Sequence, residues 1–216
     1  MQVIAVASTK GGTGKTMLAL QLGALSAESK LRTLVIDSDS QMSAMIFSKL
    51  SKVPGLTIKA HRKGALQPIL TGLIGQYDRV FIDVGGFDGT LFRSALISAD
   101  LAIIPTSVGP PDIWALSQQT LVALREVSKY RATPLKTRLV INRYRPNTRL
   151  SKSVAEALQK LSDEFPLFST VMQTRDAYAI SLSQGLGVTQ YDRASKAALE
   201  LQNLYGEMEA ALASDT

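Results

Sequence analysis

The sequence predicts an α/β fold in which a mostly parallel sheet is covered by helices on both faces. Short runs of Val, Ile, Leu and Ala without polar alternation recur along the chain, as expected of strands that are buried on both faces. These runs lie at residues 2–8, 33–37, 79–84, 101–105 and 138–142. Helical patterns lie between them, at about residues 15–29, 41–50, 64–74, 89–98 and 112–129. Alternation of this kind places ligands at the carboxyl ends of the strands.

Length and composition favour one soluble domain over residues 1–216. No apolar run reaches the roughly 18 residues that a membrane span requires, and the first residues are typical of a buried strand and not of a signal peptide. We therefore expect a cytoplasmic protein without a membrane partner. The chain has no Cys, which excludes thiolate-held iron–sulfur clusters and zinc knuckles.

The net charge of +6 permits a polyanionic partner. The excess of positive charge is concentrated in the second half of the chain, because residues 125–152 hold nine Lys or Arg and a single acid, Glu126. A solvated basic face explains such a run as well as a binding surface does.

The first apolar run leads into a glycine-rich loop that is followed by a helical pattern. Glycines let backbone N–H groups turn toward phosphate oxygens, Lys15 places an ammonium on the β- and γ-phosphates, and the Thr16 hydroxyl is a Mg²⁺ ligand. Thr9 stands where the usual motif has its first glycine, but a second lysine, Lys10, precedes the glycines, and this is the deviant Walker A motif. The chain is therefore predicted to be a P-loop NTPase that binds ATP and Mg²⁺. The predicted nucleotide-binding residues of the loop are Lys10, Gly11, Gly12, Thr13, Gly14, Lys15, Thr16 and Met17.

Carboxylates follow two further apolar runs. Asp37 and Asp39 end the second run, and Asp83 comes directly after a short apolar run in a Walker B arrangement that holds Mg²⁺ through water. Taken alone, Asp83 is also explained as a helix cap. Together with Thr16, we expect Asp37 and Asp83 to form the metal site.

The combination of Lys10–Thr16 with Asp-x-Asp-x-Gln at residues 37–41 resembles the ParA/MinD family of dimeric ATPases. This resemblance implies that Asp39 orients the attacking water and that Asp37 lies in the outer shell of Mg²⁺. It also implies that Lys10, which has no evident partner in its own subunit, crosses a dimer interface to the nucleotide of the other subunit. Lys10, Lys15 and Asp39 are thus the expected catalytic residues.

The resemblance covers nearly the whole chain, but some details differ. Asn142 matches the adenine-contacting Asn of the family, although an Asn that ends a strand is often a turn residue. Ser40 replaces the usual Pro after the second Asp, and Gly85-Gly86-Phe87 replaces the usual Pro-containing stretch after Walker B. Trp114 is expected in the core or in an interface and not at a ligand site.

Within the family, the residues favour DNA partition. The absence of Cys excludes the iron–sulfur reductases, and the acidic tail over residues 205–216 differs from the basic membrane helix of MinD. Residues 175–205 resemble the carboxyl end of ParA proteins, in which bases at the positions of Arg175, Arg193 and Lys196 contact DNA phosphates. Scattered surface bases are the competing explanation.

The chain begins at its first strand, so it resembles the short plasmid ParA class, which lacks an N-terminal helix-turn-helix. The resemblance then implies an ATP-bound homodimer on non-specific duplex DNA, nucleoid association, and stimulation by a separate centromere-binding adaptor of the ParB or ParG kind. Two alternatives remain open: a positioning ATPase for a cargo other than DNA, and a metabolic P-loop enzyme of the dethiobiotin synthetase type.

Overall fold

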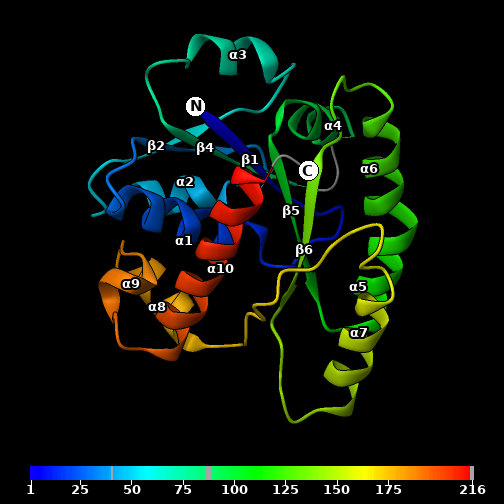
Figure 1. The fold of residues 1–216 in the computed structure, drawn as a ribbon. Coiled ribbons are helices and arrows are strands. Elements are labelled where there is room, and N and C mark those ends of the chain that lie inside the picture. Colours follow the sequence, from blue (N-terminus) through cyan, green and yellow to red (C-terminus); the bar gives the residue numbers. More distant parts are fainter. Residues whose placement is uncertain (40, 86–88, 215–216) are drawn as a thin grey trace.

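A computed structural model describes residues 1–39, 41–85 and 89–214, and within them it shows one all-parallel sheet (Figure 1). The six strands are β1 (Gln2–Ala7), β2 (Thr33–Asp37), β3 (Leu56–Ala60), β4 (Arg79–Val84), β5 (Leu101–Ser107) and β6 (Lys136–Asn142). Their order is β3-β2-β4-β1-β5-β6. The predicted α/β P-loop architecture is therefore confirmed.

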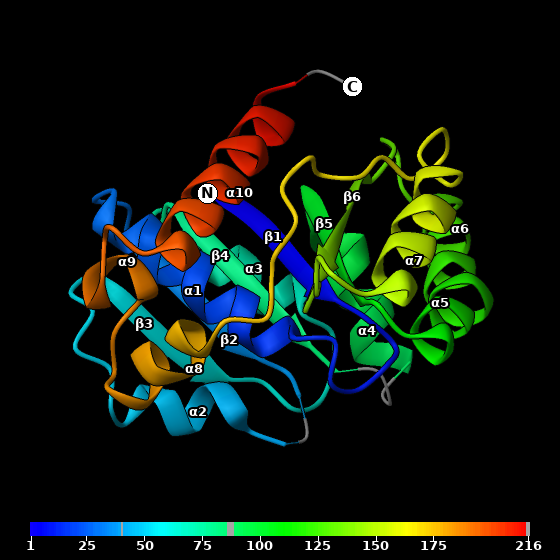
Figure 2. The ribbon, with the colours of Figure 1, turned by 90° about the horizontal axis from the view of Figure 1, so that it is seen from below.

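Successive side chains of the strands enter two different hydrophobic cores, one on each face of the sheet. In β1, Val3 and Ala5 belong to one core, whereas Ile4 and Val6 belong to the other. The first core is covered by α3 (Gln67–Gly72), α4 (Gly89–Ser98), α6 (Leu121–Ser128) and α7 (Arg149–Gln159). The second is covered by α1 (Lys15–Glu28), α2 (Ser43–Ser48), α8 (Asp176–Ser183), α9 (Val188–Tyr191) and α10 (Lys196–Ala213), and Figure 2 shows the two groups on opposite sides of the strands. Burial on both faces explains why these strands are continuous apolar runs.

The central position of β1 brings the motifs together. β1 lies between β4 and β5, and β2 lies beside β4, with Asp37 in register with Asp83. The carboxyl ends of these strands meet at one edge of the sheet. The glycine-rich loop and the two carboxylates therefore share that edge, as parallel strand order predicts.

The edge strand β3 is absent from the sequence prediction. It pairs only with β2, and its side chains are half-buried or exposed from Leu56 to Ala60. An edge strand with one open face lacks the continuous apolar run by which the other strands were recognised. The sequence prediction also set no bounds for α7, α8, α9 and α10, and it made α2 and α3 longer than they are.

The helix predicted over residues 112–129 is interrupted. It consists of α5 (Pro110–Ala115), a π-helical turn η1 (Leu116–Thr120) and α6. The π turn places the buried Thr120 hydroxyl 2.8 Å from the Thr9 hydroxyl, and Thr120 Oγ1 also accepts a hydrogen bond of 3.2 Å from the Thr9 amide. π turns inside α-helices are frequent at functional sites. Here the turn supports the first residue of the phosphate loop.

Trp114 is not a core residue, because 62% of its surface is exposed on α5. That part of the prediction is wrong, and the interface role stays a prediction. Ser40, Gly86 and Phe87, where the sequence departs from the pattern of the family that it resembles, lie outside the described residues. None of the helices in the described ranges has the length and apolar character needed to cross a bilayer.

Candidate nucleotide site

The loop between β1 and α1 has the backbone of a phosphate cradle. Gly12 and Gly14 adopt φ values of 80° and 92°, which residues with a side chain rarely adopt. A Cβ atom at Gly14 would also lie 2.1 Å from Asn142 Nδ2, so no other residue fits there. α1 begins directly after Gly14, with its unpaired N–H groups facing the loop.

The two motif lysines have different environments. Lys15 is 5% exposed, and its ammonium donates a 3.2 Å hydrogen bond to the Lys10 carbonyl inside the loop. Lys10 Nζ instead lies 2.6 Å from Oδ1 of Asp112, in the first turn of α5. The expectation that Lys10 has no partner within its own subunit is therefore wrong. Asp112 was missed because it is distant in the sequence and belongs to no motif.

Asp83 is a buried carboxylate with unused oxygens. The residue is fully buried, and neither oxygen has a hydrogen-bond partner among the described residues. Burial raises the pKa of Asp83 to about 7; the Thr16 hydroxyl and the Lys15 ammonium act against this shift, whereas the nearby Asp37 adds to it. A divalent cation would supply the missing positive charge. The pair of Thr16 and Asp83 thus fits a Mg²⁺ site in its donor chemistry.

Asp37 acts on the backbone of the segment that follows it. Its Oδ1 accepts the Asp39 amide at 3.1 Å and its Oδ2 accepts the Met45 amide at 3.0 Å, so both oxygens of this buried carboxylate are occupied. Asp39 and α2 are thereby both linked to the end of β2. This arrangement fits an outer position relative to Mg²⁺ and not direct ligation.

Asp39 lies between two other segments of the sheet edge. A Cβ atom at Gly85 would be 2.7 Å from Asp39 Oδ2, so the end of β4 approaches this carboxylate closely. Arg62, which follows β3, donates to the Asp39 carbonyl. Sequence reasoning missed Arg62 because it missed β3.

Asn142 lies beneath the phosphate loop. It is 1% exposed; its Nδ2 donates to the Thr13 carbonyl at 2.7 Å and its Oδ1 accepts the Arg143 amide at 2.9 Å. A cavity of 880 Å³ opens next to Gly14 and Met17, and Asn142 is not among its lining residues. The structure therefore gives Asn142 a loop-fixing contact, while the adenine contact stays a prediction.

This cavity is bounded by four parts of the chain. Its walls are Gly14, Met17, Ser107, Val108, Gly109, Asp112, Arg143, Arg145, Thr148, Leu150, Ser151, Thr174, Arg175, Asp176, Tyr178, Ala179 and Leu182. It adjoins the loop at the start of α1 and combines apolar walls with a few polar groups, which is the usual character of a nucleoside site.

The three predicted DNA-binding residues come from neighbouring segments but differ in exposure and in how closely each is paired with a carboxylate. Arg193 is 79% exposed and lies 3.9 Å from Glu28, and Lys196 is exposed in the first turn of α10. Arg175 and Lys196 both line a groove of 440 Å³, whereas Arg193 does not. Arg175 is held by Glu200 at 2.5 Å. Lys196 and Arg193 are thus available to an external anion, and Arg175 is already paired.

The model of the "CobQ/CobB/MinD/ParA nucleotide binding domain" family matches residues 4–188. The chain belongs to this family. It is a nucleotide-binding ATPase of the ParA/MinD type, as the deviant Walker A motif predicted.

Relatives of this ParA/MinD-type ATPase include positioning and partition proteins. The maintenance of carboxysome distribution protein A of Halothiobacillus neapolitanus is 25% identical over 210 residues, which cover 95% of both chains. The fold is similar to that of apo McdA from Cyanothece, with a TM-score of 0.81 at 19% identity over 98% of this chain and 99% of that one. It is also similar to a plasmid partition protein from Borrelia burgdorferi, with a TM-score of 0.70 at 20% identity over 97% and 98%.

Proposed function

We propose that this ATPase forms an ATP-bound dimer that binds duplex DNA without sequence preference and is released when an adaptor protein stimulates hydrolysis. The observation that carries the proposal is the exposure of Arg193 and Lys196 beside the first turn of α10, on a chain with a deviant Walker A loop. The relatives' roles in plasmid partition and carboxysome distribution support it. Nucleoid association in the cytoplasm follows from the same proposal.

The site residues divide the chemistry between them. Lys15 binds the β- and γ-phosphates from inside the loop, and Asp39 orients the attacking water. Thr16 and Asp83 would hold Mg²⁺, with Asp37 behind them, and the ion supplies positive charge against the phosphate oxygens. Lys10 reaches the nucleotide of the second subunit, which makes turnover depend on dimerisation.

The DNA contact depends on charge. Lys and Arg that neutralise phosphates release counterions and give salt-sensitive binding that does not read sequence. A dimer presents two copies of Arg193 and Lys196, so it binds much more tightly than a monomer with one copy. Arg175 contributes only if a phosphate displaces Glu200, because its guanidinium already has a carboxylate partner.

Two other functions fit the family. A positioning ATPase can move a cargo other than a plasmid, as the carboxysome distribution proteins indicate by name, and this alternative keeps the DNA contact. A metabolic enzyme of the CobQ/CobB or dethiobiotin synthetase kind would not bind DNA and would need an acceptor pocket beside the phosphate loop.

The test is binding of a random-sequence duplex, measured by fluorescence anisotropy with ATP, with ADP and without nucleotide. We expect tight binding only with ATP and Mg²⁺, and ATP turnover that the duplex stimulates. Binding that ignores the nucleotide would contradict the proposal, and no binding in any state would contradict it and favour the metabolic alternative. Purification together with the product of the adjacent downstream gene then identifies the adaptor.

A further inference from the structure

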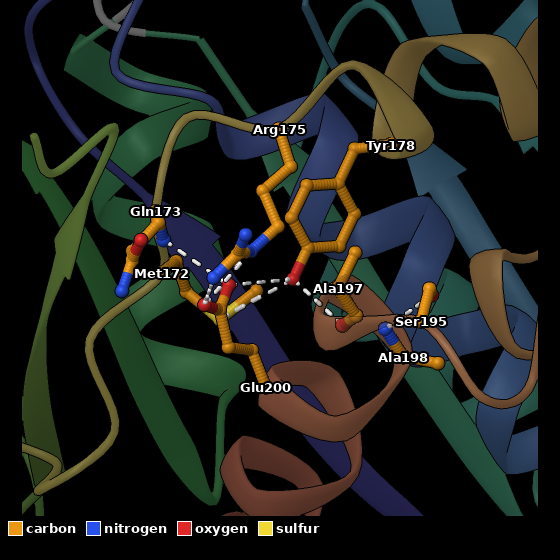
Figure 3. Close-up of polar contacts among 8 residues, drawn as sticks. All are labelled: Met172, Gln173, Arg175, Tyr178, Ser195, Ala197, Ala198 and Glu200. Atoms are coloured by element: carbon orange, nitrogen blue, oxygen red, sulfur yellow. Dashed lines mark hydrogen bonds and ion pairs between the residues drawn. The ribbon is translucent and has the colours of Figure 1, made fainter.

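A half-buried carboxylate on α10 holds one wall of the 880 Å³ cavity beside the phosphate loop. Glu200 Oε1 accepts hydrogen bonds from Arg175 Nε at 2.9 Å and Nη2 at 2.5 Å, and Oε2 accepts the Gln173 amide at 3.2 Å (Figure 3). The Tyr178 hydroxyl donates to the Ala197 carbonyl at 2.9 Å and lies 3.4 Å from Oε2. A single side chain thus connects three residues of the segment before and within α8 to α10.

This cluster is shielded from water. The side chains of Arg175 and Glu200 are 23% and 14% exposed, and Tyr178 is 4% exposed. Hydrogen bonding to Glu200 raises the pKa of Arg175, and burial, followed by the charge of Glu200, raises that of Tyr178. The guanidinium of Arg175 therefore remains charged, and hydrogen bonds that a charged group donates are stronger than those between neutral groups.

Two of the three residues that Glu200 holds, Arg175 and Tyr178, face the cavity, but Glu200 does not. Arg175 and Tyr178 line the cavity together with Gly14 and Met17 of the phosphate-loop side, whereas Glu200 is absent from its walls. Any contact of Glu200 with a ligand there is indirect. Its effect must pass through the guanidinium and the phenol that it orients.

We propose that Glu200 is a positioning residue for nucleotide binding, which fixes Arg175 and Tyr178 as the wall against which the nucleoside rests. This inference rests on the proposed function only in assigning the 880 Å³ cavity to the nucleoside of ATP. It reassigns Arg175 from the DNA surface to the nucleotide site. It also links the nucleotide site to the proposed DNA surface through α10, because Lys196 lies one helical turn before Glu200 on the same helix.

The main test is Glu200→Gln, which keeps the size of the side chain and removes its charge. Losing charge-assisted bonds of about 1.5 kcal/mol or more should raise the KM for ATP by roughly tenfold or more. The kcat at saturating ATP should change by less than about twofold, because a loss of ground-state binding alone raises KM. Preference for ATP over GTP should fall as the wall loosens.

A matched control lies on the same helix. Glu207 also accepts backbone N–H groups from the preceding segment, from Ser169 at 2.5 Å and Thr170 at 2.8 Å, but none of these three residues lines the cavity. Glu207→Gln should therefore lower the thermal unfolding midpoint by an amount similar to Glu200→Gln and leave KM and base preference unchanged. Equal KM values for the two variants would show a merely structural role and overturn the proposal.

Two more variants make the outcome decisive. Arg175→Lys keeps the charge but loses the two-nitrogen contact with Glu200, so it should raise KM even if Glu200→Gln fails to fold; an unchanged KM overturns the proposal. Ala179→Leu adds bulk to the cavity wall at a residue other than the ones that Glu200 holds. If Ala179→Leu leaves the KM for ATP unchanged, the assignment of the cavity is wrong. If Ala179→Leu raises KM and Glu200→Gln does not, the cavity stands and the role of Glu200 fails.

Discussion

Lys10 and Asp112 form an ion pair within one subunit, with Nζ 2.6 Å from Oδ1 and the two side chains 35% and 14% exposed. A lysine that reaches the nucleotide of a second subunit must leave this partner. If Lys10 has the proposed role, this pair opposes dimerisation.

Asp112→Asn should make dimerisation easier. A partly exposed pair contributes about 0.5–1 kcal/mol, so half-maximal dimer formation should require roughly two- to fivefold less ATP. Multi-angle light scattering across an ATP titration measures this. Lys10→Ala is the control, which should bind nucleotide and stay monomeric. An Asp112→Asn protein that dimerises at the ATP concentration of the parent would show that the pair does not oppose dimerisation.

Asp39→Ala should bind ATP, dimerise and fail to turn over, because the group proposed to orient the attacking water is lost while the phosphate contacts remain. The measurement is phosphate release together with size-exclusion chromatography. Lys15→Ala serves as comparison, since removing charge from the β- and γ-phosphates should abolish ATP binding itself. Should Asp39→Ala hydrolyse ATP at the parent rate, Asp37 would become the next candidate.

Asp83 should make the protein without Mg²⁺ and nucleotide less stable as pH rises. Its pKa is about 7 in the folded state against an ordinary 3.8, so between these values the folded state binds a proton that the unfolded state has released. The free energy of unfolding then falls from about pH 4 to pH 7, by roughly 4 kcal/mol at most for a shift of about three units.

Asp83→Asn removes that titration and should flatten the pH dependence while raising stability at pH 8. Urea unfolding at pH 5, 6, 7 and 8 checks this. Asp78→Asn is the control. Hydrogen bonds from Arg32 lower the pKa of the Asp78 carboxyl to about 2 from an ordinary 3.8. The Asp78 carboxylate therefore contributes to the free energy of unfolding above pH 3.8, and this contribution is lost only in stronger acid. Parallel pH profiles for Asp83→Asn and the parent would mean that the carboxyl is charged throughout.

The sequence predicts those parts of the fold that one short stretch of residues determines by itself. Buried parallel strands appear as apolar runs, and the residues that follow those runs meet at one edge because the order of strands places β1, β2 and β4 side by side. The phosphate loop is recognisable because its lysines and glycines lie within one short stretch of the sequence.

The remaining features depend on contacts between residues far apart in the chain. Asp112 meets Lys10, Thr120 meets Thr9 through a π turn, and Glu200 meets Arg175 across 25 residues. No periodicity or spacing in the sequence indicates any of these three pairs. Residue type does not identify them either, because Arg175 and Arg193 are both arginines, yet Arg175 is 23% exposed with Glu200 at 2.5 Å, whereas Arg193 is 79% exposed with Glu28 at 3.9 Å.

The salt dependence of DNA binding by the ATP-bound dimer tests the proposed function most directly. Replacing Arg193 and Lys196 together removes two contacts in each subunit, so the slope of log K against log salt should flatten by roughly three to four units at ~0.9 per contact. Glu207→Gln, away from this surface, should keep the slope of the parent. Sequence preference should not change, because phosphates hold no base information. A double variant that keeps the parent's salt slope would contradict the account and move the DNA surface elsewhere, first to the bases of residues 143–152.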